Sequence, residues 1–254
     1  MESQTNIADT DLPFQGAILE PSEQDLPVDP DRILESFEMD RSQADEYLMD
    51  TIGQYTARCR ELCEPLARYA LFNNLDFAPG AGALTLDGVR FNLGEWVTGF
   101  LKKSTWIAVF LGTAGEQVEQ LSKQLMQDGH LLEGYIVDLI GSELAEGVAV
   151  SVHHAIENNA RQAGLNITNR YSPGYCHWPV SDQTQIFSLI GKDSCGIRLT
   201  RSSLMIPMKS VSGIIGVGKH VKQMGYKCRV CPDEKCIMRE KNGNEGSETP
   251  VFLC

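Results

Sequence analysis

The chain has 254 residues, which is enough for one large domain or two small ones. Its 34 acidic and 22 basic residues give a formal net charge of −12, which argues against general nucleic-acid binding, since that needs a basic face. No apolar stretch approaches the roughly 20 residues of a membrane-spanning helix, and the N-terminus lacks the apolar core of a secretory signal. We therefore expect a cytoplasmic protein with neither a nucleic-acid nor a membrane partner.

The first 50 residues hold 14 of the acids and only two basic residues, Arg32 and Arg41. Residues 1–28 lack periodicity and contain three prolines, so we expect a disordered acidic tail there. Asp31 or Ser42 is a candidate cap for the first helices. From about 43 to 71, apolar residues recur at helical spacing, which predicts one long helix against a core.

Alternating residues around Asp87-Gly88 predict a hairpin over 84–91, because Asp-Gly favours the positive φ angles of a tight turn. The following residues predict further elements in order: a helix capped by Asn92 and ending near Lys102, a buried strand over 105–112, a helix from Gly115 to Asp128, and a long helix over 131–163.

Beyond this long helix, Asp182 is a candidate cap for a short helix that ends near Ile190. The ranges 197–200 and 203–218 read as strands, with Pro207 at an edge or bulge. Helices and strands are mixed without regular βαβ alternation. The sequence therefore predicts an α+β fold.

The stretch from Arg170 to Pro179 reads Arg-Tyr-Ser-Pro-Gly-Tyr-Cys-His-Trp-Pro. It combines a cation that can pair with a carboxylate, a Pro-Gly turn that a ligand can approach closely, and three aromatic rings that can stack on a planar group. A ligand-binding loop and a packed strand-to-helix turn both agree with this composition.

At this point the chain resembles the reactivation domain of cobalamin-dependent methionine synthase. The resemblance covers roughly residues 130–218. Three segments in one order carry it: Leu144-Ala145-Glu146; Arg170-Tyr171-Ser172-Pro173-Gly174-Tyr175, followed by Pro179; and Leu199-Thr200, Ser202 or Ser203, Met205, Pro207 and Ser210-Val211-Ser212-Gly213.

The resemblance implies a curved antiparallel sheet flanked by helices, formed by residues 29–225, with S-adenosylmethionine in a shallow groove. It also implies a function: the domain presents S-adenosylmethionine to an oxidised cobalamin, and one electron and one methyl group restore the methyl form. The expected partners are a separate cobalamin-binding protein or methionine synthase, and an electron donor. We see no segment like the other domains of the synthase, so we expect a stand-alone protein.

The same resemblance and the residue chemistry assign roles within this groove. Arg170 would hold the ligand's carboxylate, and Glu146 would face its ammonium or sulfonium group. Gly174 would leave room for the adenosyl group, with backbone carbonyls of Ser172 and Pro173 accepting hydrogen bonds. Tyr175 would lie at the mouth of the groove facing cobalamin, and His177 is a second candidate to face it. No general base or nucleophile is expected, because the methyl transfer moves no proton.

Two departures from the family leave an alternative open. The family uses an aspartate from an N-terminal extended segment, which has no convincing match among residues 1–60. It also has ligand-contacting aromatic residues where this chain has Ile214 and Ile215. A non-catalytic adaptor that binds a corrinoid protein therefore remains the alternative.

The C-terminal tail, residues 226–254, contains Cys228, Cys231 and Cys236. A Cys-x2-Cys pair with a third cysteine nearby can hold zinc or an iron–sulfur cluster, with Cys254, Cys195 or His220 as the fourth ligand. Reduced thiols without a metal are equally compatible with this spacing. A metal cluster would make the chain an electron-transfer protein, which is a third reading of its function.

Overall fold

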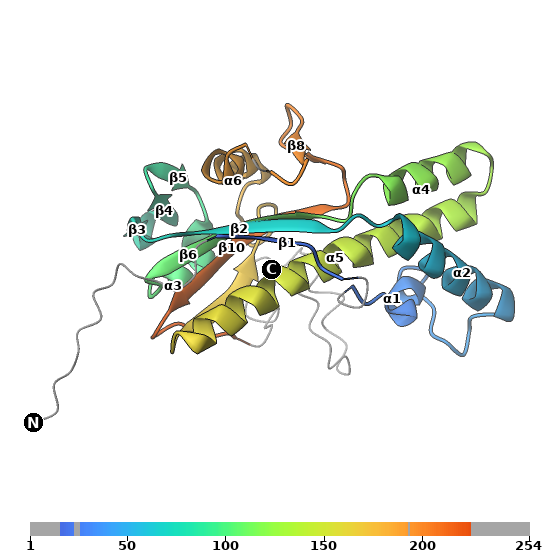
Figure 1. Cartoon of the computed structure of the whole chain (residues 1–254), viewed down its shortest axis with the longest axis horizontal. Coiled ribbons are helices and arrows are strands. Elements are labelled where there is room, and N and C mark those ends of the chain that lie inside the picture. The colour runs from blue at the N-terminus through green and yellow to red at the C-terminus, as the bar shows by residue number, and fades with distance from the viewer. Residues whose placement is uncertain (1–15, 23–25, 193, 225–254) are drawn as a thin grey trace, which may run out of the picture.

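The structure is a computed structural model that describes residues 16–22, 26–192 and 194–224. Its centre is a five-stranded antiparallel sheet (Figure 1), in which the strand order is β1-β2-β6-β10-β7. The strands are β1 (Ala17–Leu19), β2 (Leu66–Phe72), β6 (Trp106–Thr113), β10 (Ser210–Gly218) and β7 (Asn166–Tyr171).

The central strand β6 separates two hydrophobic cores. All eight of its residues are buried, because layers of structure cover both faces of the sheet. Side chains alternate between the faces of a strand. Ala108 and Phe110 accordingly join one core, whereas Val109 and Leu111 join the other.

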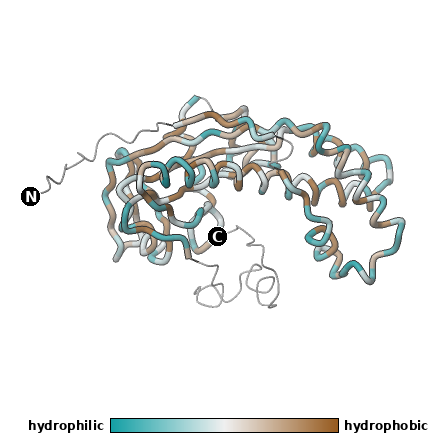
Figure 2. Tube along the Cα trace, turned by 60° about the horizontal axis from the view of Figure 1, so that its bottom comes forward, coloured by the Kyte–Doolittle hydropathy of each residue, from teal (hydrophilic) through white to brown (hydrophobic). Residues whose placement is uncertain are grey.

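The first core lies beneath the 32-residue helix α5 (Leu131–Gln162), which contacts four strands of the sheet. The N-terminal half of α5 packs with α4 (Gln117–Gln127) and α2 (Glu46–Leu62) and extends past the sheet (Figure 1). The short helix α1 (Pro30–Glu35) also packs on α5. In Figure 2 the strands of the sheet are mostly hydrophobic, whereas the loop at the far end of this helical extension is hydrophilic.

The second core lies on the opposite face of the sheet. Helices α3 (Gly94–Leu101) and α6 (Gln183–Ile190) contribute to it. The remaining elements on this side are small: a sheet of β3 (Leu75–Ala78), β4 (Ala83–Leu86) and β5 (Val89–Phe91), a two-stranded sheet of β8 (Arg198–Leu199) and β9 (Met205–Ile206), and the 3₁₀ turns η2 (Pro79–Ala81) and η3 (Val180–Asp182).

The structure confirms the predicted α+β class and several elements. The hairpin turns at Asp87 and Gly88, which have φ angles of 48° and 82°. The buried strand appears as β6, the long helix as α5, and the short helix at 183–190 as α6. The helix that was expected from Gly115 appears as α4 and begins at Gln117.

Other expectations were wrong. The predicted helix over 43–71 ends at Leu62, and residues 66–72 form β2, because their apolar side chains also alternate and the strand pairs with β6 along its length. Asp29 and Asp45, not Asp31 or Ser42, cap α1 and α2. The predicted strand over 203–218 is divided into β9 and β10 around Pro207.

Two of the expected side-chain caps are also absent. Neither Asn92 nor Asp182 makes a capping hydrogen bond, and the carboxylate of Asp182 instead accepts from the backbone N–H of Asn92 at 2.7 Å. This bond ties the end of β5 to the start of α6.

The structure describes some residues that precede residue 29. Residues 17–19 form β1, and Leu26 is buried in the first core, so the expectation of disorder does not hold for these residues. The predicted Cys-containing segment 226–254, with Cys228, Cys231 and Cys236, lies outside the described residues. None of the described helices is long and apolar enough to cross a membrane.

Candidate functional site

Strand β10 has an open edge at its beginning. It pairs with β6 from Ser210 onward, but β7 joins its other side only at Ile214. Beyond Tyr171 the chain turns away from the sheet, so residues 210–213 lack a neighbouring strand on this side among the described residues. Such an edge leaves backbone groups available to a ligand.

A cavity of about 320 Å³, the α6-side cavity, lies on one side of this edge. Its walls come from the loop after β7, from η3 and α6, from the β8–β9 hairpin and from β10, and they include Ser172, Pro173, Tyr175, Val180, Leu204 and Met205. None of the described residues that line it carries a charge. The second and third of the sequence segments singled out above therefore meet here, with Ser172, Pro173 and Tyr175 facing Ser210 and Ser212 of β10.

Hydrogen bonds hold the loop after β7 in a tight conformation. The N–H of Gly174 donates to the carbonyl of Trp178 at 2.7 Å, and the N–H of Trp178 donates to the carbonyl of Tyr175 at 2.8 Å. Gly174, Cys176 and His177 have φ angles of 98°, 52° and 64°, which cost conformational energy for the two non-glycine residues. The loop thus presents Tyr175 from a fixed backbone.

Of the three aromatic rings in this motif, two belong to the core. Tyr171 is buried and stacks on Phe100 with ring centroids 6.2 Å apart. Trp178 is buried, and its Nε1 donates to the carboxylate of Asp182 at 3.0 Å. Of these three rings, Tyr175 alone is among the described residues that line the α6-side cavity, so both readings of the aromatic motif are partly correct.

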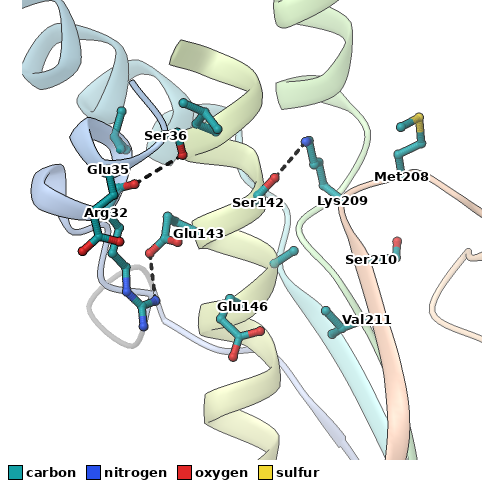
Figure 3. A pocket seen from close by; sticks show the side chains of 13 residues that line it. Arg32, Glu35, Ser36, Ser142, Glu143, Glu146, Met208, Lys209, Ser210 and Val211 are labelled. Carbon is teal, nitrogen blue, oxygen red and sulfur yellow. Dashed lines mark hydrogen bonds and ion pairs between the residues drawn. The ribbon is translucent and has the colours of Figure 1, made fainter. Parts of the chain in front are cut away.

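A second cavity of about 410 Å³, the α5-side cavity, lies between α1, α5 and the start of β10 (Figure 3). It contains five charged residues: Arg32, Glu35, Glu143, Glu146 and Lys209. The two cavities share Met208, Ser210 and Val211 as a common wall. A single extended ligand could therefore cross the β10 edge and occupy both.

The predicted site residues Glu146 and Arg170 form a buried ion pair between α5 and β7. The side chain of Arg170 is only 2% exposed and lines neither cavity, whereas Glu146 faces the α5-side cavity. Burial raises the pKa of Glu146, and the guanidinium of Arg170 opposes that rise. Burial also raises the pKa of Glu143, one turn earlier on α5, although Arg32 contacts it at 3.1 Å.

Other predicted residues lie outside the cavities. His177 is exposed near Gly94 and is not among the lining residues of either cavity. Gly174 is exposed in the loop beside Tyr175. Ile214 and Ile215 are fully buried, one in each core, so the residues of β10 that face the cavities are 210–212.

Sequence reasoning missed the charged residues of the α5-side cavity, namely Arg32, Glu35, Glu143 and Lys209. One signal was available: Glu143 and Glu146 are three residues apart in a predicted helix and so share a face. Nothing in the sequence connects this helix face with Arg32, which lies 111 positions from Glu143. The two residues meet only because α1 packs on α5 in the folded chain.

A family model, "Vitamin B12 dependent methionine synthase, activation domain", matches residues 91–236. The chain belongs to this family. The match runs from the last residue of β5 through β10, and thus includes the loop after β7 and the β10 edge, whereas α1 and α2 precede it.

A solved structure shares the fold. It is described as "Crystal Structure of the MetH Reactivation Domain bound to AdoHcy" and aligns with a TM-score of 0.57 at 16% sequence identity, over 82% of this chain and 79% of that one. This similarity confirms the predicted architecture of an antiparallel sheet flanked by helices. The comparison with curated proteins found no match.

Proposed function

We propose that this activation-domain protein binds S-adenosylmethionine across the β10 edge and supports the reductive methylation of cobalamin carried by a separate protein, methionine synthase in the first instance. The family membership and the ligand named for the similar structure support this proposal. The observation that carries it is the pair of adjoining cavities at an open strand edge, one uncharged and one rich in charge.

The two cavities match the two ends of the ligand. S-adenosylmethionine has a planar, uncharged adenine at one end and a zwitterionic amino-acid group at the other, joined through a sulfonium. The ring of Tyr175 and the apolar side chains around it suit the planar end. The carboxylates of Glu143 and Glu146 suit the cationic groups.

The reaction needs an electron from a separate donor. One electron reduces cob(II)alamin to cob(I)alamin, whose cobalt then takes the methyl group. The carbon–sulfur bond of the sulfonium breaks, its electron pair stays on sulfur, and S-adenosylhomocysteine leaves. No proton moves, so the protein contributes orientation and exclusion of water.

Within this proposal each predicted residue has a role. Ser172 and Pro173 shape the wall of the adenosyl end, Gly174 makes the turn beside them without adding a side chain, and Tyr175 lies where the ligand and the incoming cobalamin would meet. Arg170 holds Glu146 at the wall of the α5-side cavity, and it would have to leave this ion pair to grip a carboxylate itself. His177 is proposed to face cobalamin from the outer side of the loop.

Exposed apolar side chains surround the mouth of the α6-side cavity. Met208 and Leu204 are 63% and 58% exposed, and Val180 is 39% exposed. Exposed apolar groups that border a cavity are typical of binding surfaces. They provide a surface on which the cobalamin-carrying partner could dock.

Calorimetric titration of the full chain with S-adenosylmethionine and with S-adenosylhomocysteine tests the proposal. Saturable binding in the micromolar range, about −8 kcal/mol, is expected. Addition of reductant, S-adenosylmethionine and methionine synthase loaded with cob(II)alamin should then produce the spectrum of methylcobalamin. Association with the synthase without affinity for either nucleoside would instead identify the adaptor.

A further inference from the structure

Trp178 closes the loop that presents Tyr175. The carbonyl of Trp178 accepts from the N–H of Gly174 at 2.7 Å, and its own N–H donates to the carbonyl of Tyr175 at 2.8 Å. Within this loop Cys176 and His177 have φ angles of 52° and 64°. Left-handed backbone at non-glycine residues costs energy and persists only where the surroundings hold it. Whatever fixes Trp178 therefore also fixes the position of Tyr175.

The side chain of Trp178 is held in the second core. Its ring packs edge-on against Phe91 with ring centroids 6.1 Å apart, and its Nε1 donates to Oδ2 of Asp182 at 3.0 Å. The same carboxylate oxygen accepts from the backbone N–H of Asn92 at 2.7 Å. Asp182 is only 2% exposed, and both of these donors are neutral. A carboxylate that is buried with neutral donors costs free energy, but it accepts stronger hydrogen bonds than a neutral group does. Asp182 therefore holds the indole ring firmly to the end of β5.

The next residue holds the opposite wall of the α6-side cavity. The hydroxyl of Ser212 on β10 donates to Oε1 of Gln183 at 2.6 Å, and both side chains are buried and line the cavity. Asp182 and Trp178, in contrast, are not among its described lining residues. Two consecutive residues thus fasten the loop after β7 and strand β10 to the start of α6. Together they set the distance between Tyr175 and the β10 edge.

We propose that Asp182 is a positioning residue of the site, which holds the loop after β7 through Trp178 so that Tyr175 faces the ligand. This inference rests on the proposed function, because the nucleoside is the ligand that Tyr175 is positioned to meet. Asp182 does not line the cavity, so its effect reaches the ligand through the indole ring and the two backbone hydrogen bonds of the loop. A site that loses its supporting contacts binds less tightly, even though the groups that touch the ligand remain.

A double-mutant cycle between Asp182 and Tyr175 tests this role by calorimetry of the full chain. The ligands are S-adenosylhomocysteine and 5′-methylthioadenosine, which has the same nucleoside and thioether without the amino-acid group. Asp182→Ala should weaken the binding of both by about 10-fold, the lower end of the range for a lost hydrogen bond to a charged group. In a chain that already carries Tyr175→Ala, the same change should have little further effect, because the ring that Asp182 positions is gone.

Additive losses of affinity in the double variant would overturn the inference, because they would show that Asp182 acts independently of Tyr175. Unchanged affinity of Asp182→Ala would overturn it as well. If the wild-type chain binds neither nucleoside, the proposed function fails and this inference fails with it.

Two further variants keep the test valid if Asp182→Ala does not fold. Trp178→Phe keeps an aromatic ring beside Phe91 but removes the indole N–H, so it should reproduce the loss of affinity for both ligands. Asp182→Asn keeps an oxygen acceptor without the charge, and its affinity should lie between those of the wild type and Asp182→Ala. Normal affinity of Trp178→Phe would contradict the route through the indole ring.

Ser122→Ala is the matched control for a general loss of stability. The hydroxyl of Ser122 donates to the carbonyl of Gly134 at 2.8 Å in a buried contact between α4 and α5, and Ser122 lines neither cavity. This variant should unfold at a lower urea concentration than the wild type and bind both ligands normally. Weakened binding by Ser122→Ala would show that affinity follows stability alone, and it would remove the support for positioning.

Discussion

The two cavities flank the same strand edge, yet they are built differently. The α5-side cavity is lined by five charged residues from α1, α5 and the start of β10, and ion pairs fix most of them. The α6-side cavity has no charged residue among its described lining, and a tight hydrogen-bonded loop presents its aromatic ring. Ion pairs therefore fix the positions of the side chains in the α5-side cavity, whereas the backbone conformation of the loop fixes the position of Tyr175 in the α6-side cavity.

This difference predicts that the two sides respond to substitution in opposite ways. Removing one charged side chain from the α5-side cavity should lower stability as well as affinity for the ligand, because the oppositely charged residue of the ion pair remains buried without compensation. Removing a side chain from the α6 side should affect binding alone, because the loop keeps its own hydrogen bonds.

The largest effect is expected for Arg170→Met. This change leaves Glu146 as a buried carboxylate without its guanidinium and should lower the free energy of unfolding by about 3–5 kcal/mol in urea denaturation. The double variant with Glu146→Gln should recover most of this loss, because it removes the buried charge.

Arg58→Met provides the control, because Arg58 and Glu61 form an exposed pair on α2, and such pairs contribute little. A loss for Arg170→Met no larger than for this control would show that the buried pair does not stabilise the α5 side. The same conclusion would follow if the double variant of Arg170→Met and Glu146→Gln were no more stable than Arg170→Met alone.

A second prediction concerns His153, which lies on α5 and is buried. Burial, followed by the nearby charges of Arg170 and His154, lowers the pKa of His153 to about 4. Its folded pKa thus lies below the value of about 6.5 for an unfolded chain. Between pH 4 and 6.5 the unfolded state binds more protons than the folded state. The contribution of His153 to the free energy of unfolding is therefore fully present above pH 6.5, and about 3 kcal/mol is lost as the pH drops toward 4.

Chemical denaturation at a series of pH values measures this loss. His153→Asn should flatten the dependence between pH 6.5 and 4, whereas the same change at the exposed His220, which is not among the groups that shift the pKa of His153, should leave it as in the wild type. An equal slope in wild type and His153→Asn would assign the acid sensitivity to other groups.

The loop that lines the α6-side cavity could be singled out from the sequence, and the α5-side cavity could not. Ser172, Pro173 and Tyr175 follow one another in a single loop, so one motif revealed them together. Arg32, Glu143 and Lys209 come from three distant segments and meet only through packing of α1 and β10 on α5. No local sequence pattern predicts that side chains from such distant segments will lie together.

The fold shows the same limit. The continuous apolar run of β6 and the helical pattern of α5 were sufficient to predict these two elements correctly. Residues 66–72 carry apolar side chains that satisfy both periods in part, and pairing with β6 decides that they form a strand. The aromatic motif was equally ambiguous, because only the tertiary structure shows that Trp178 is buried and Tyr175 is not.

The smallest predicted effect separates the two cavities by ligand. Tyr175→Ala should weaken S-adenosylhomocysteine and 5′-methylthioadenosine by a similar factor, roughly 1–3 kcal/mol for a lost aromatic stacking partner, since both ligands have the adenine. Stability should change little, because Tyr175 is only half-buried and the loop is held by backbone hydrogen bonds. Tyr47→Ala, at a tyrosine that is 60% exposed on α2, is the control and should bind both ligands normally. A loss confined to S-adenosylhomocysteine would place Tyr175 at the amino-acid end, which would reverse the assignment of the two cavities.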